Sequence, residues 1–246
     1  MHISNPMDAK IRLYVEHPLG VGQSVPLDRG QAHYLFGVMR QSLGAHLLLF
    51  NGTDGEWRAE VVEAGKRGGV LRCVEQTKPL QLPPDLWLCF APIKKARTDF
   101  IVEKATEMGA ARIVPMQTEF TNSGRIQRDR LQAHAVEAAE QCGGTCVPEV
   151  VDLVRFRSLM DTWDSTRRIM FCDEALATAA PALLQGAVGP WAIFIGPEGG
   201  FSAREREKLN GLEYAGAVSL GPRILRADTA AVAAMTVWQQ TCGDWV

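Results

Sequence analysis

The sequence predicts an α/β protein in which a small β-barrel-like domain precedes a larger domain built on a mostly parallel sheet. Two observations predict this fold class. Short β-rich runs dominate before residue 80, whereas strand-like and helix-like segments alternate after it. Such an alternation is typical of a parallel sheet that helices cover on both faces.

The first part of the chain is predicted to form the barrel-like domain. Its turn signal, Asn51–Gly55, lies between two β-rich runs and favours a hairpin. A helix is expected over 30–43, where Leu35, Val38 and Met39 recur at helical spacing. The β-rich runs are 12–15, 46–50, 56–62 and 70–74.

A proline-rich linker separates the two parts. Prolines at 79, 83 and 84 favour an extended backbone and exclude a continuing strand ladder. We therefore expect a β-barrel domain at 1–78, a linker at 79–85 and an α/β domain at 86–246.

The second part contains the alternating elements. Expected strands cover 86–91, 112–116, 149–154, 168–172, 191–195 and 217–220. Expected helices cover 97–108, 128–142, 177–184, 202–210 and 229–241, with one more short helix before residue 168.

Composition sets broad limits on function. The 246 residues carry a net charge of −2, so any affinity for nucleic acid must come from local basic clusters such as 94–97 or 125–130. Each cluster could equally be a solvated helix face. No apolar run approaches the ~20 residues of a membrane span, and we expect no signal peptide. The six scattered cysteines, with Cys142 and Cys146 lacking a second ligand pair, predict reduced thiols, no metal site and a cytoplasmic location.

The most unusual loop is FIGPEGGFS, residues 194–202. It is not a phosphate-binding loop of the Walker A type, because no Gly-Lys-Ser/Thr closes it. Pro197 and Glu198 would oppose a pyrophosphate, and Ser202 with Glu205 predicts a capping box that leaves the next helix in no need of an anion. A structural turn without a ligand is the alternative.

Two further loops follow expected strands, at the edge where open α/β sheets bind ligands. One ends in the acids Asp173 and Glu174, which would also suit the first turn of a helix. The other, SLGPRILRADT at 219–229, contains apolar residues in a connection, so we expect it to pack beneath another segment. The helix after it is apolar almost all round, as a buried or interface helix is.

Taken together, GPEGGFS, LGPRILRADTA and the preceding MFCDE resemble the SPOUT methyltransferases. Within them, the chain is similar over nearly its whole length to the RsmE family of 16S rRNA uridine-N3 methyltransferases. Segments 104–109, 137–141 and 147–149 match the middle of the family, and Arg12 with 33–40 matches its N-terminal PUA-like RNA-binding barrel. Residues 118–124 and 142–145 depart from the family pattern, which leaves substrate docking open.

The resemblance implies a trefoil knot in which the chain after Leu220 threads through an earlier loop and buries Ile224 and Leu225. It also implies S-adenosylmethionine as cofactor, no metal, and a homodimer built by the last helix. The cofactor-binding residues that it implies are Phe171, Cys172, Ile195, Gly196, Pro197, Glu198, Gly199, Gly200, Ser219, Leu220, Gly221, Arg223, Ile224, Leu225 and Thr229.

Methylation of uridine N3, which carries a proton on the pairing edge, requires an unpaired base and a fixed donor to the uracil oxygens. We predict Arg226 as that donor, Arg12 as the second choice, and Glu198 or Asp228 as a proton acceptor or as a group that orients an arginine. The predicted RNA-binding residues are Arg12, Arg40, Lys94, Arg97 and Arg223. Arg223 could instead pair with acids around the knot.

Two other functions stay open at this point. A ribose 2′-O-methyltransferase of the same superfamily is disfavoured, because 94–97 does not supply the Asn-x-x-Arg segment expected for it. A catalytically silent RNA-binding protein is disfavoured by the intact glycine loop, because a pure binder gains nothing from a cofactor pocket.

Overall fold

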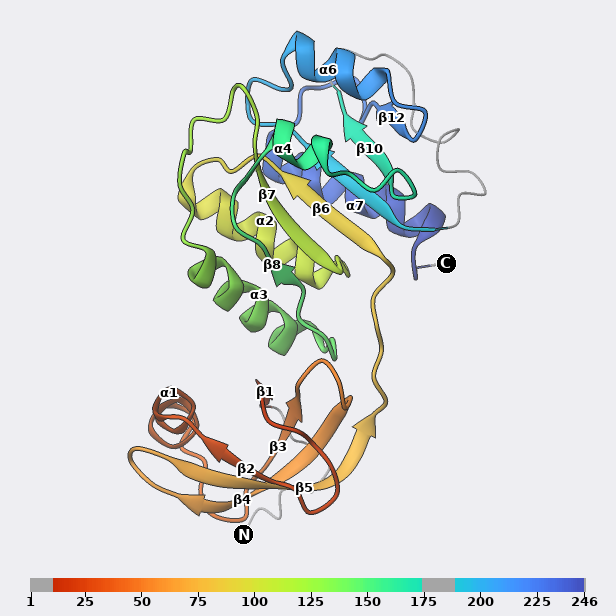
Figure 1. Cartoon of the computed structure of the whole chain (residues 1–246). Coiled ribbons are helices and arrows are strands. Elements are labelled where there is room, and N and C mark those ends of the chain that lie inside the picture. Colours follow the sequence, from red (N-terminus) through yellow and green to blue (C-terminus); the bar gives the residue numbers. More distant parts are fainter. Residues whose placement is uncertain (1–10, 174–188, 246) are drawn as a thin grey trace. The chain divides into compact units, whose positions relative to one another are not determined.

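The structure is a computed structural model that describes residues 11–173 and 189–245 (Figure 1). The chain divides into two compact units. The first consists of Met1–Leu82 with Ala139–Cys146, and the second of Pro83–Ala138 with Val147–Val246. The domain boundaries expected from the sequence place residues 139–146 in the second domain, whereas in the structure they belong to the first unit.

The first unit is built on a five-stranded sheet in the order β1-β3-β4-β5-β2. Only the β1–β3 pair is parallel. The strands are β1 (Arg12–Tyr14), β2 (Ser24–Leu27), β3 (His46–Phe50), β4 (Glu56–Ala64) and β5 (Gly69–Lys78). Four of them confirm the expected β-rich runs. The unexpected one, β2, is a four-residue edge strand that contains Pro26, and only an edge position tolerates a proline there.

A short helical stretch stands where a single longer helix was expected. It consists of α1 (Arg29–Ala32) and the π-helix η1 (His33–Val38). At the end of η1 the Met39 N–H donates to the Tyr34 carbonyl, five residues back. The wider π turn changes the helical spacing, so Leu35 is buried while Val38 is 58% exposed.

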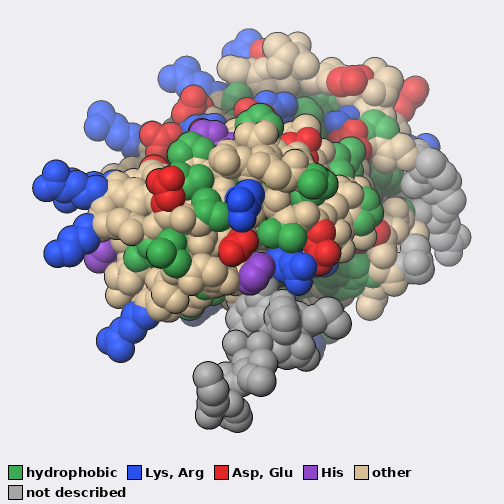
Figure 2. Space-filling view, turned by 90° about the horizontal axis from the view of Figure 1, so that it is seen from below, with side chains coloured by type: hydrophobic (Ala, Val, Ile, Leu, Met, Phe, Trp, Pro, Cys, Tyr) green, Lys and Arg blue, Asp and Glu red, His purple; other side chains and the backbone are tan. Residues whose placement is uncertain are grey.

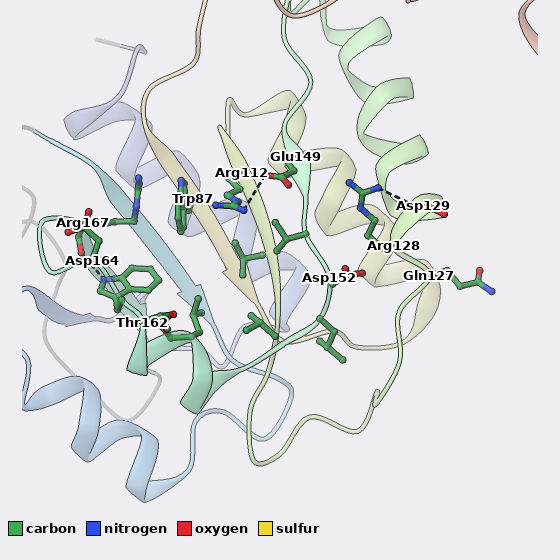
Figure 3. Close-up of a pocket in the computed structure, with 16 residues that line it drawn as sticks. Trp87, Arg112, Gln127, Arg128, Asp129, Glu149, Asp152, Thr162, Asp164 and Arg167 are labelled. Atoms are coloured by element: carbon green, nitrogen blue, oxygen red, sulfur yellow. Dashed lines mark hydrogen bonds and ion pairs between the residues drawn. The ribbon is translucent and has the colours of Figure 1, made fainter. Parts of the chain in front are cut away.

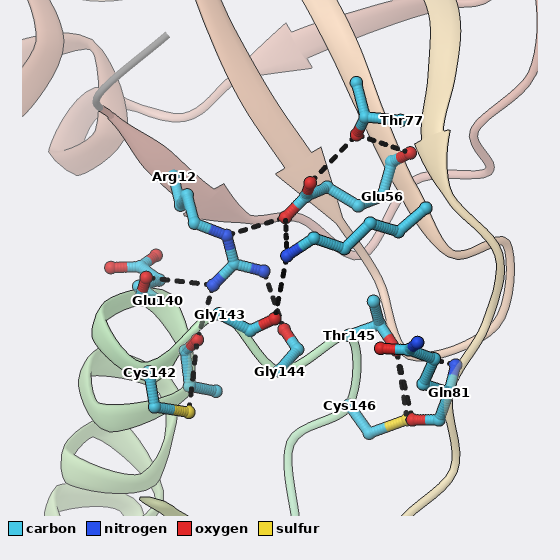
Figure 4. A network of polar contacts seen from close by, with 12 residues as sticks. Arg12, Glu56, Thr77, Gln81, Glu140, Cys142, Gly143, Gly144, Thr145 and Cys146 are labelled. Carbon is cyan, nitrogen blue, oxygen red and sulfur yellow. Dashed lines mark hydrogen bonds and ion pairs between the residues drawn. The ribbon is translucent and has the colours of Figure 1, made fainter. Parts of the chain in front are cut away.

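Arg12 ties residues 139–146 into the first unit (Figure 4). Its Nε donates to the Glu56 carboxylate at 2.7 Å. Its Nη1 donates to the carbonyls of Ala139 and Glu140 at 2.6 and 2.9 Å, and its Nη2 donates to the Gly144 carbonyl at 2.7 Å. Glu56 is only 1% exposed, and two cations make its burial tolerable: the Arg12 guanidinium, which is the closer, and Lys78 Nζ at 3.6 Å.

The second unit contains a parallel sheet in the order β12-β10-β11-β6-β7-β8, with β9 also pairing with β7. Expected strands at 168–172 and 191–195 are confirmed at both ends, whereas the one at 149–154 is split into two short pieces. The strands are β6 (Leu86–Phe90), β7 (Arg112–Gln117), β8 (Glu149–Val150), β9 (Val154–Arg155), β10 (Arg168–Cys172), β11 (Trp191–Ile195) and β12 (Ala215–Val218).

Helices cover both faces of this sheet (Figure 1). Alternate residues of a strand face opposite sides, so Leu88 packs with α2, α3 and α7 while its neighbour Cys89 packs with α4 and α6. The helices are α2 (Lys95–Glu107), α3 (Arg128–Cys142), α4 (Phe156–Asp161), α6 (Ala203–Asn210) and α7 (Ala227–Cys242). The helix expected at 177–184 lies outside the described residues, and the knot stays a prediction. In the part of the chain that the structure describes, no helix is long and apolar enough to cross a membrane.

The Arg12 contacts predict a large loss of stability when the side chain is removed. Arg12→Ala removes the closer of the two cations beside the buried Glu56 carboxylate and leaves Lys78 Nζ at 3.6 Å, so the first unit should lose about 3 kcal/mol of unfolding free energy. Native-state hydrogen exchange of peptides from β3 and β4 measures this loss. The matched control is Arg72→Ala, whose partner Glu60 lies 3.4 Å away on the surface; it should cost less than about 1 kcal/mol. Equal losses in the two variants would contradict the assigned role of Arg12.

Candidate functional site

Three neighbouring parallel strands of the second unit end at one hollow. Cys172, Ile195 and Val218 are the last residues of β10, β11 and β12, and all three line the hollow. The register that pairs Cys172 with Val218 keeps these strand ends level. The hollow therefore lies at the carboxyl edge of the sheet, where open α/β sheets bind ligands.

The glycine turn after β11 forms one wall of the hollow through Gly196, Pro197, Glu198 and Gly200. The turn is tight, because the Gly200 N–H donates to the Pro197 carbonyl at 2.9 Å. A Cβ on Gly196 would lie 3.1 Å from the Gly200 carbonyl carbon. Gly200 itself has a φ of +67°, a conformation that L side chains rarely adopt. Both glycines are thus required by the path of the backbone.

The helix that follows the turn satisfies its own first N–H groups. The Glu205 N–H donates to Ser202 Oγ at 3.3 Å, and the Ser202 N–H donates to the Glu205 carboxylate at 2.9 Å. This confirms the predicted capping box. The amino end of α6 therefore does not need an anion, and the turn before it is suited to a ligand that carries no negative charge.

The segment after β12 forms the opposite wall. Leu220, Gly221, Arg223 and Leu225 line the hollow. Ile224 lies between two of these residues but is 77% exposed, so its expected burial is wrong. Its neighbours Arg223 and Leu225 line the hollow, whereas the Ile224 side chain does not and is left in solvent.

Several predicted cofactor-binding residues do not line this hollow. Phe171 is fully buried in the core, with its ring centroid 6.3 Å from that of Phe201. Gly199 faces away, and a Cβ there would lie 3.5 Å from the Phe120 Cβ. The other predicted cofactor-binding residues that do not line the hollow are Ser219, Ile224 and Thr229.

Sequence reasoning left four lining residues out of its predicted set. Ala227 and Ala230 of α7 line the hollow, as does Val218, and none of them carries a polar signal that could have singled it out. Asp173 does carry one, because an acid directly follows an apolar strand. It is 9% exposed, and its carboxylate lies 3.6 Å from Arg206 Nη1.

The side chains that line the hollow include no strong nucleophile. Burial raises the pKa of the Cys172 thiol to about 12, so the thiol is neutral near pH 7 and is a poor nucleophile. Asp173 and Glu198 bring two carboxylates to the hollow, and Arg223 brings one guanidinium. The remaining contacts are backbone groups and aliphatic side chains, which suits a ligand with polar edges and a positive rather than a negative charge.

The predicted catalytic residues lie in different places. Arg226 is exposed at the N-cap of α7, directly beside the lining residues Leu225 and Ala227 but not among them. Asp228 lies 3.7 Å from Arg97 of α2, so its carboxylate already has a cationic partner, and both roles expected for it stay predictions. Arg12 already uses four of its five N–H groups within the first unit.

The other predicted RNA-binding residues are exposed or terminal. Arg40, in the first unit, is exposed and has a φ of +54°, which marks a strained backbone position. Lys94 is the N-cap of α2 and is also exposed. Their contact with RNA stays a prediction.

A larger hollow of about 1120 Å³ lies elsewhere in the second unit (Figure 3). Arg112 and Arg167 lie on either side of the Trp87 ring, with their Cζ atoms 4.8 and 3.9 Å from its centroid. Each arginine also pairs with a carboxylate, Arg112 with Glu149 at 3.2 Å and Arg167 with Asp85 at 2.9 Å. Because its aromatic ring and its cations already have partners, we do not assign this hollow as the functional site.

Surface charge alone does not locate a ligand. In Figure 2, Lys and Arg side chains project along one edge of the visible face, while carboxylates are scattered over the rest. Within residues 11–173 and 189–245, no group of three His, Cys, Asp or Glu side chains is placed to hold a metal ion.

Two family models match the chain. One, described as an RNA methyltransferase domain, matches residues 80–239, and the other, described as an RNA methyltransferase PUA domain, matches residues 27–72. Similar proteins include the ribosomal RNA small subunit methyltransferase E of Rickettsia conorii, which is 28% identical over 91% of this chain and 93% of that protein. The protein of the same name from Buchnera aphidicola subsp. Schizaphis graminum is 28% identical over 95% and 97%.

Two similar solved structures contain a bound cofactor. One is a ribosomal RNA small subunit methyltransferase E from Neisseria gonorrhoeae bound to S-adenosyl methionine, with a TM-score of 0.88 and 26% identity over 96% of this chain and 99% of that one. The other is a putative methyltransferase from Legionella pneumophila in complex with SAM, with a TM-score of 0.86 and 28% identity over 95% and 98%.

The glycine turn gives a stability prediction. Gly200→Ala should cost about 1 to 2 kcal/mol, because a φ of +67° strains any residue with a Cβ. A Cβ there would meet no atom within 4 Å, so the cost comes from the backbone alone. The matched control is Gly211→Ala at the end of α6, where φ is −80° and no such cost is expected. Urea unfolding of the two variants tests the difference, and a Gly200→Ala variant as stable as the control would contradict it.

Proposed function

This chain belongs to the RNA methyltransferase family, and we propose that it transfers a methyl group from S-adenosylmethionine to N3 of one uridine in 16S rRNA. One observation carries the proposal: three parallel strands end side by side at a hollow, and the glycine turn forms one of its walls. This part of the chain lies inside the region that the family model matches. The names of the relatives and the cofactor in the two similar structures support it.

The hollow suits the cofactor in shape and in charge. S-adenosylmethionine supplies a methyl group that is already activated on a positively charged sulfur. The required glycines Gly196 and Gly200 let backbone groups approach a ligand closely, which adenine and ribose need. Glu198, a lining carboxylate without an ion pair to any described residue, favours a cation at the hollow, whereas Asp173 already pairs with Arg206. The neutral Cys172 thiol lies in a methyl-transferring site without competing as a nucleophile.

The uridine chemistry falls to residues around the amino end of α7. As N3 loses its proton, negative charge develops on the uracil carbonyl oxygens, and a fixed arginine stabilises it. Arg226 is exposed beside the hollow and has no acidic partner among the described residues, so its guanidinium is available for this role. Glu198 is the exposed carboxylate of the lining and is the group we assign to accept or relay the proton.

The proposal also covers the RNA substrate, the cellular location and the oligomeric state. The RNA substrate is 16S rRNA, alone or in the small ribosomal subunit, met in the cytoplasm. The first unit, which contains the PUA match, contributes to RNA binding. A homodimer forms through α7, whose Val232 and Val237 remain only half-buried in the single chain.

Methylation of purified small subunits with labelled S-adenosylmethionine tests the function. We expect the label on one uridine base of 16S rRNA, as read by nuclease digestion and mass mapping. A methyl group on a ribose instead would assign the protein to 2′-O methylation. No transfer, together with no calorimetric heat on adding S-adenosylmethionine, would remove every enzymatic assignment and leave an RNA-binding protein.

Substitution of Arg226 tests the mechanism. Arg226→Ala should lower kcat by about 100-fold or more, because one donor to a developing oxyanion contributes on that scale. Its affinity for S-adenosylmethionine should stay within about twofold of the wild type, since the side chain does not line the hollow. Calorimetry and single-turnover transfer measure the two effects. A variant that loses cofactor binding would place Arg226 in a structural role.

A further inference from the structure

A third hollow, of about 580 Å³ and with a basic lining, lies in the second unit. It borders α6, the helix that follows the glycine turn. It is lined by the end of β7, the junction between β9 and α4, and α6. Gln117 of β7 pairs directly with Arg155 of β9, so both strands end at this hollow. Its basic lining residues are Arg155, Arg157, Arg204 and Lys208.

Two of these basic residues have no acidic partner in the part of the chain that the structure describes. Lys208 lies 3.2 Å from Asp161, and Arg157 lies 3.9 Å from the same carboxylate. Arg155 and Arg204 are exposed and form no ion pair with a described residue. They therefore bring to the hollow two guanidinium groups without an ion-pair partner among residues 11–173 and 189–245.

The lining also contains two acids, Glu119 and Glu205, and neither forms an ion pair with Arg155 or Arg204; Glu119 is exposed, and the Glu205 carboxylate is bound to the backbone. Glu205 is 8% exposed, and its carboxylate accepts N–H groups from Ser202 at 2.9 Å and from Glu119 at 2.8 Å. This second hydrogen bond fixes the loop after β7 against α6. The side chain of Glu205 thus holds the backbone of two segments and forms no ion pair with Arg155 or Arg204.

The clamped loop presents an aromatic ring to solvent. Phe120 follows Glu119 and is 46% exposed. Its backbone is held by a turn in which the Thr121 N–H donates to the Thr118 carbonyl at 3.2 Å. Its Cβ lies 3.5 Å from the place of a Cβ on Gly199, so Phe120 packs beside the glycine turn of the cofactor hollow. A large apolar side chain held half in water, next to that turn, is suited to contact a ligand.

From these contacts we infer that Phe120, Arg155 and Arg204 form a docking surface for single-stranded RNA that flanks the methylated nucleotide. The inference rests on the proposed function, because it takes the RNA to be the substrate. Phe120 stacks on an unpaired base, and the two arginines contact phosphates. Aromatic rings with a basic groove are the usual means of holding single strands, because every base has a face that can stack. A duplex offers no such face, so the surface selects unpaired RNA.

Binding of a fluorescein-labelled single-stranded uridine-rich RNA to the full-length protein tests the inference. Phe120→Ala should weaken this binding about tenfold, as loss of one stacked base does. Phe120→Trp should restore it. Arg155→Ala with Arg204→Ala should also weaken it about tenfold, and should lower the slope of log Kd against log salt by about 1.4, because each phosphate contact to a single strand contributes about 0.7.

Matched controls lie on the same unit away from this surface. Phe100→Ala removes another exposed phenylalanine, 39% exposed on α2, and Arg168→Ala removes an exposed arginine at the start of β10. Both should bind the RNA within about twofold of the wild type. A blunt-ended duplex RNA, which has no unpaired bases, should bind the wild type and Phe120→Ala alike.

The same proteins are titrated with S-adenosylmethionine by calorimetry, which separates the two proposals. Wild-type affinity for RNA in Phe120→Ala and in the double arginine variant would overturn the docking surface and leave the methyltransferase assignment intact. Loss of S-adenosylmethionine binding in these variants would also overturn it, because the residues would then be structural. A wild type that binds RNA through these residues but binds no S-adenosylmethionine would keep the surface and remove the proposed function.

Discussion

The parallel pairing of β10 with β11 and β12 is the constraint on which the candidate site depends. Phe171 pairs with Phe194 and Cys172 with Val218, so the three strands end at one level. Only parallel strands send all their outgoing loops to the same edge, and here the edge receives the glycine turn and the segment after β12. A slip of one residue in either register would turn the side chains to the other face of the sheet, and the hollow would lose its walls.

The second determinant is the way in which α6 begins. A helix that starts after a glycine turn normally offers its free N–H groups to a phosphate. Here Ser202 and Glu205 satisfy each other across the first turn of α6, so that attraction for anions is weakened. The lining carries the carboxylates of Asp173 and Glu198 beside the guanidinium of Arg223, and Asp173 also pairs with Arg206, so the local charge is balanced and does not call for an anion. The same fold edge that binds nucleotide phosphates in other α/β proteins is thereby suited to a sulfonium cofactor.

Much of the fold could be predicted because its elements carry strong local signals. The α/β class, the PUA-like first domain and the family resemblance are confirmed, and the strands at 168–172 and 191–195 and the helix at 128–142 have the expected ends. The failures occur where a local signal is weak or misleading. β2 is four residues long with a proline in it, and η1 changes the helical period, so neither pattern could be read from spacing.

The site was predictable to the extent that its residues are chemically unusual. The glycines and Glu198 stand out in any sequence, whereas Ala227 and Ala230 contribute only their small size. Arg12 shows why a chemically unusual residue can still be misjudged from the sequence. Its partners include three backbone carbonyls of 139–144, and carbonyls leave no mark in a sequence. An arginine that looks available in the sequence is therefore occupied in the structure.

Glu205 joins the local and the long-range parts of this architecture. As a capping residue it could be replaced by glutamine, whose single carbonyl oxygen also accepts the N–H of the N-cap residue. In this fold, however, both carboxylate oxygens accept a backbone N–H, one from Ser202 and one from Glu119. A glutamine would present its NH₂ group to the second N–H, donor against donor, and would release the loop that carries Phe120. The negative charge at this position is therefore required by the junction of β7 and α6, for a reason that the helix cap alone does not supply.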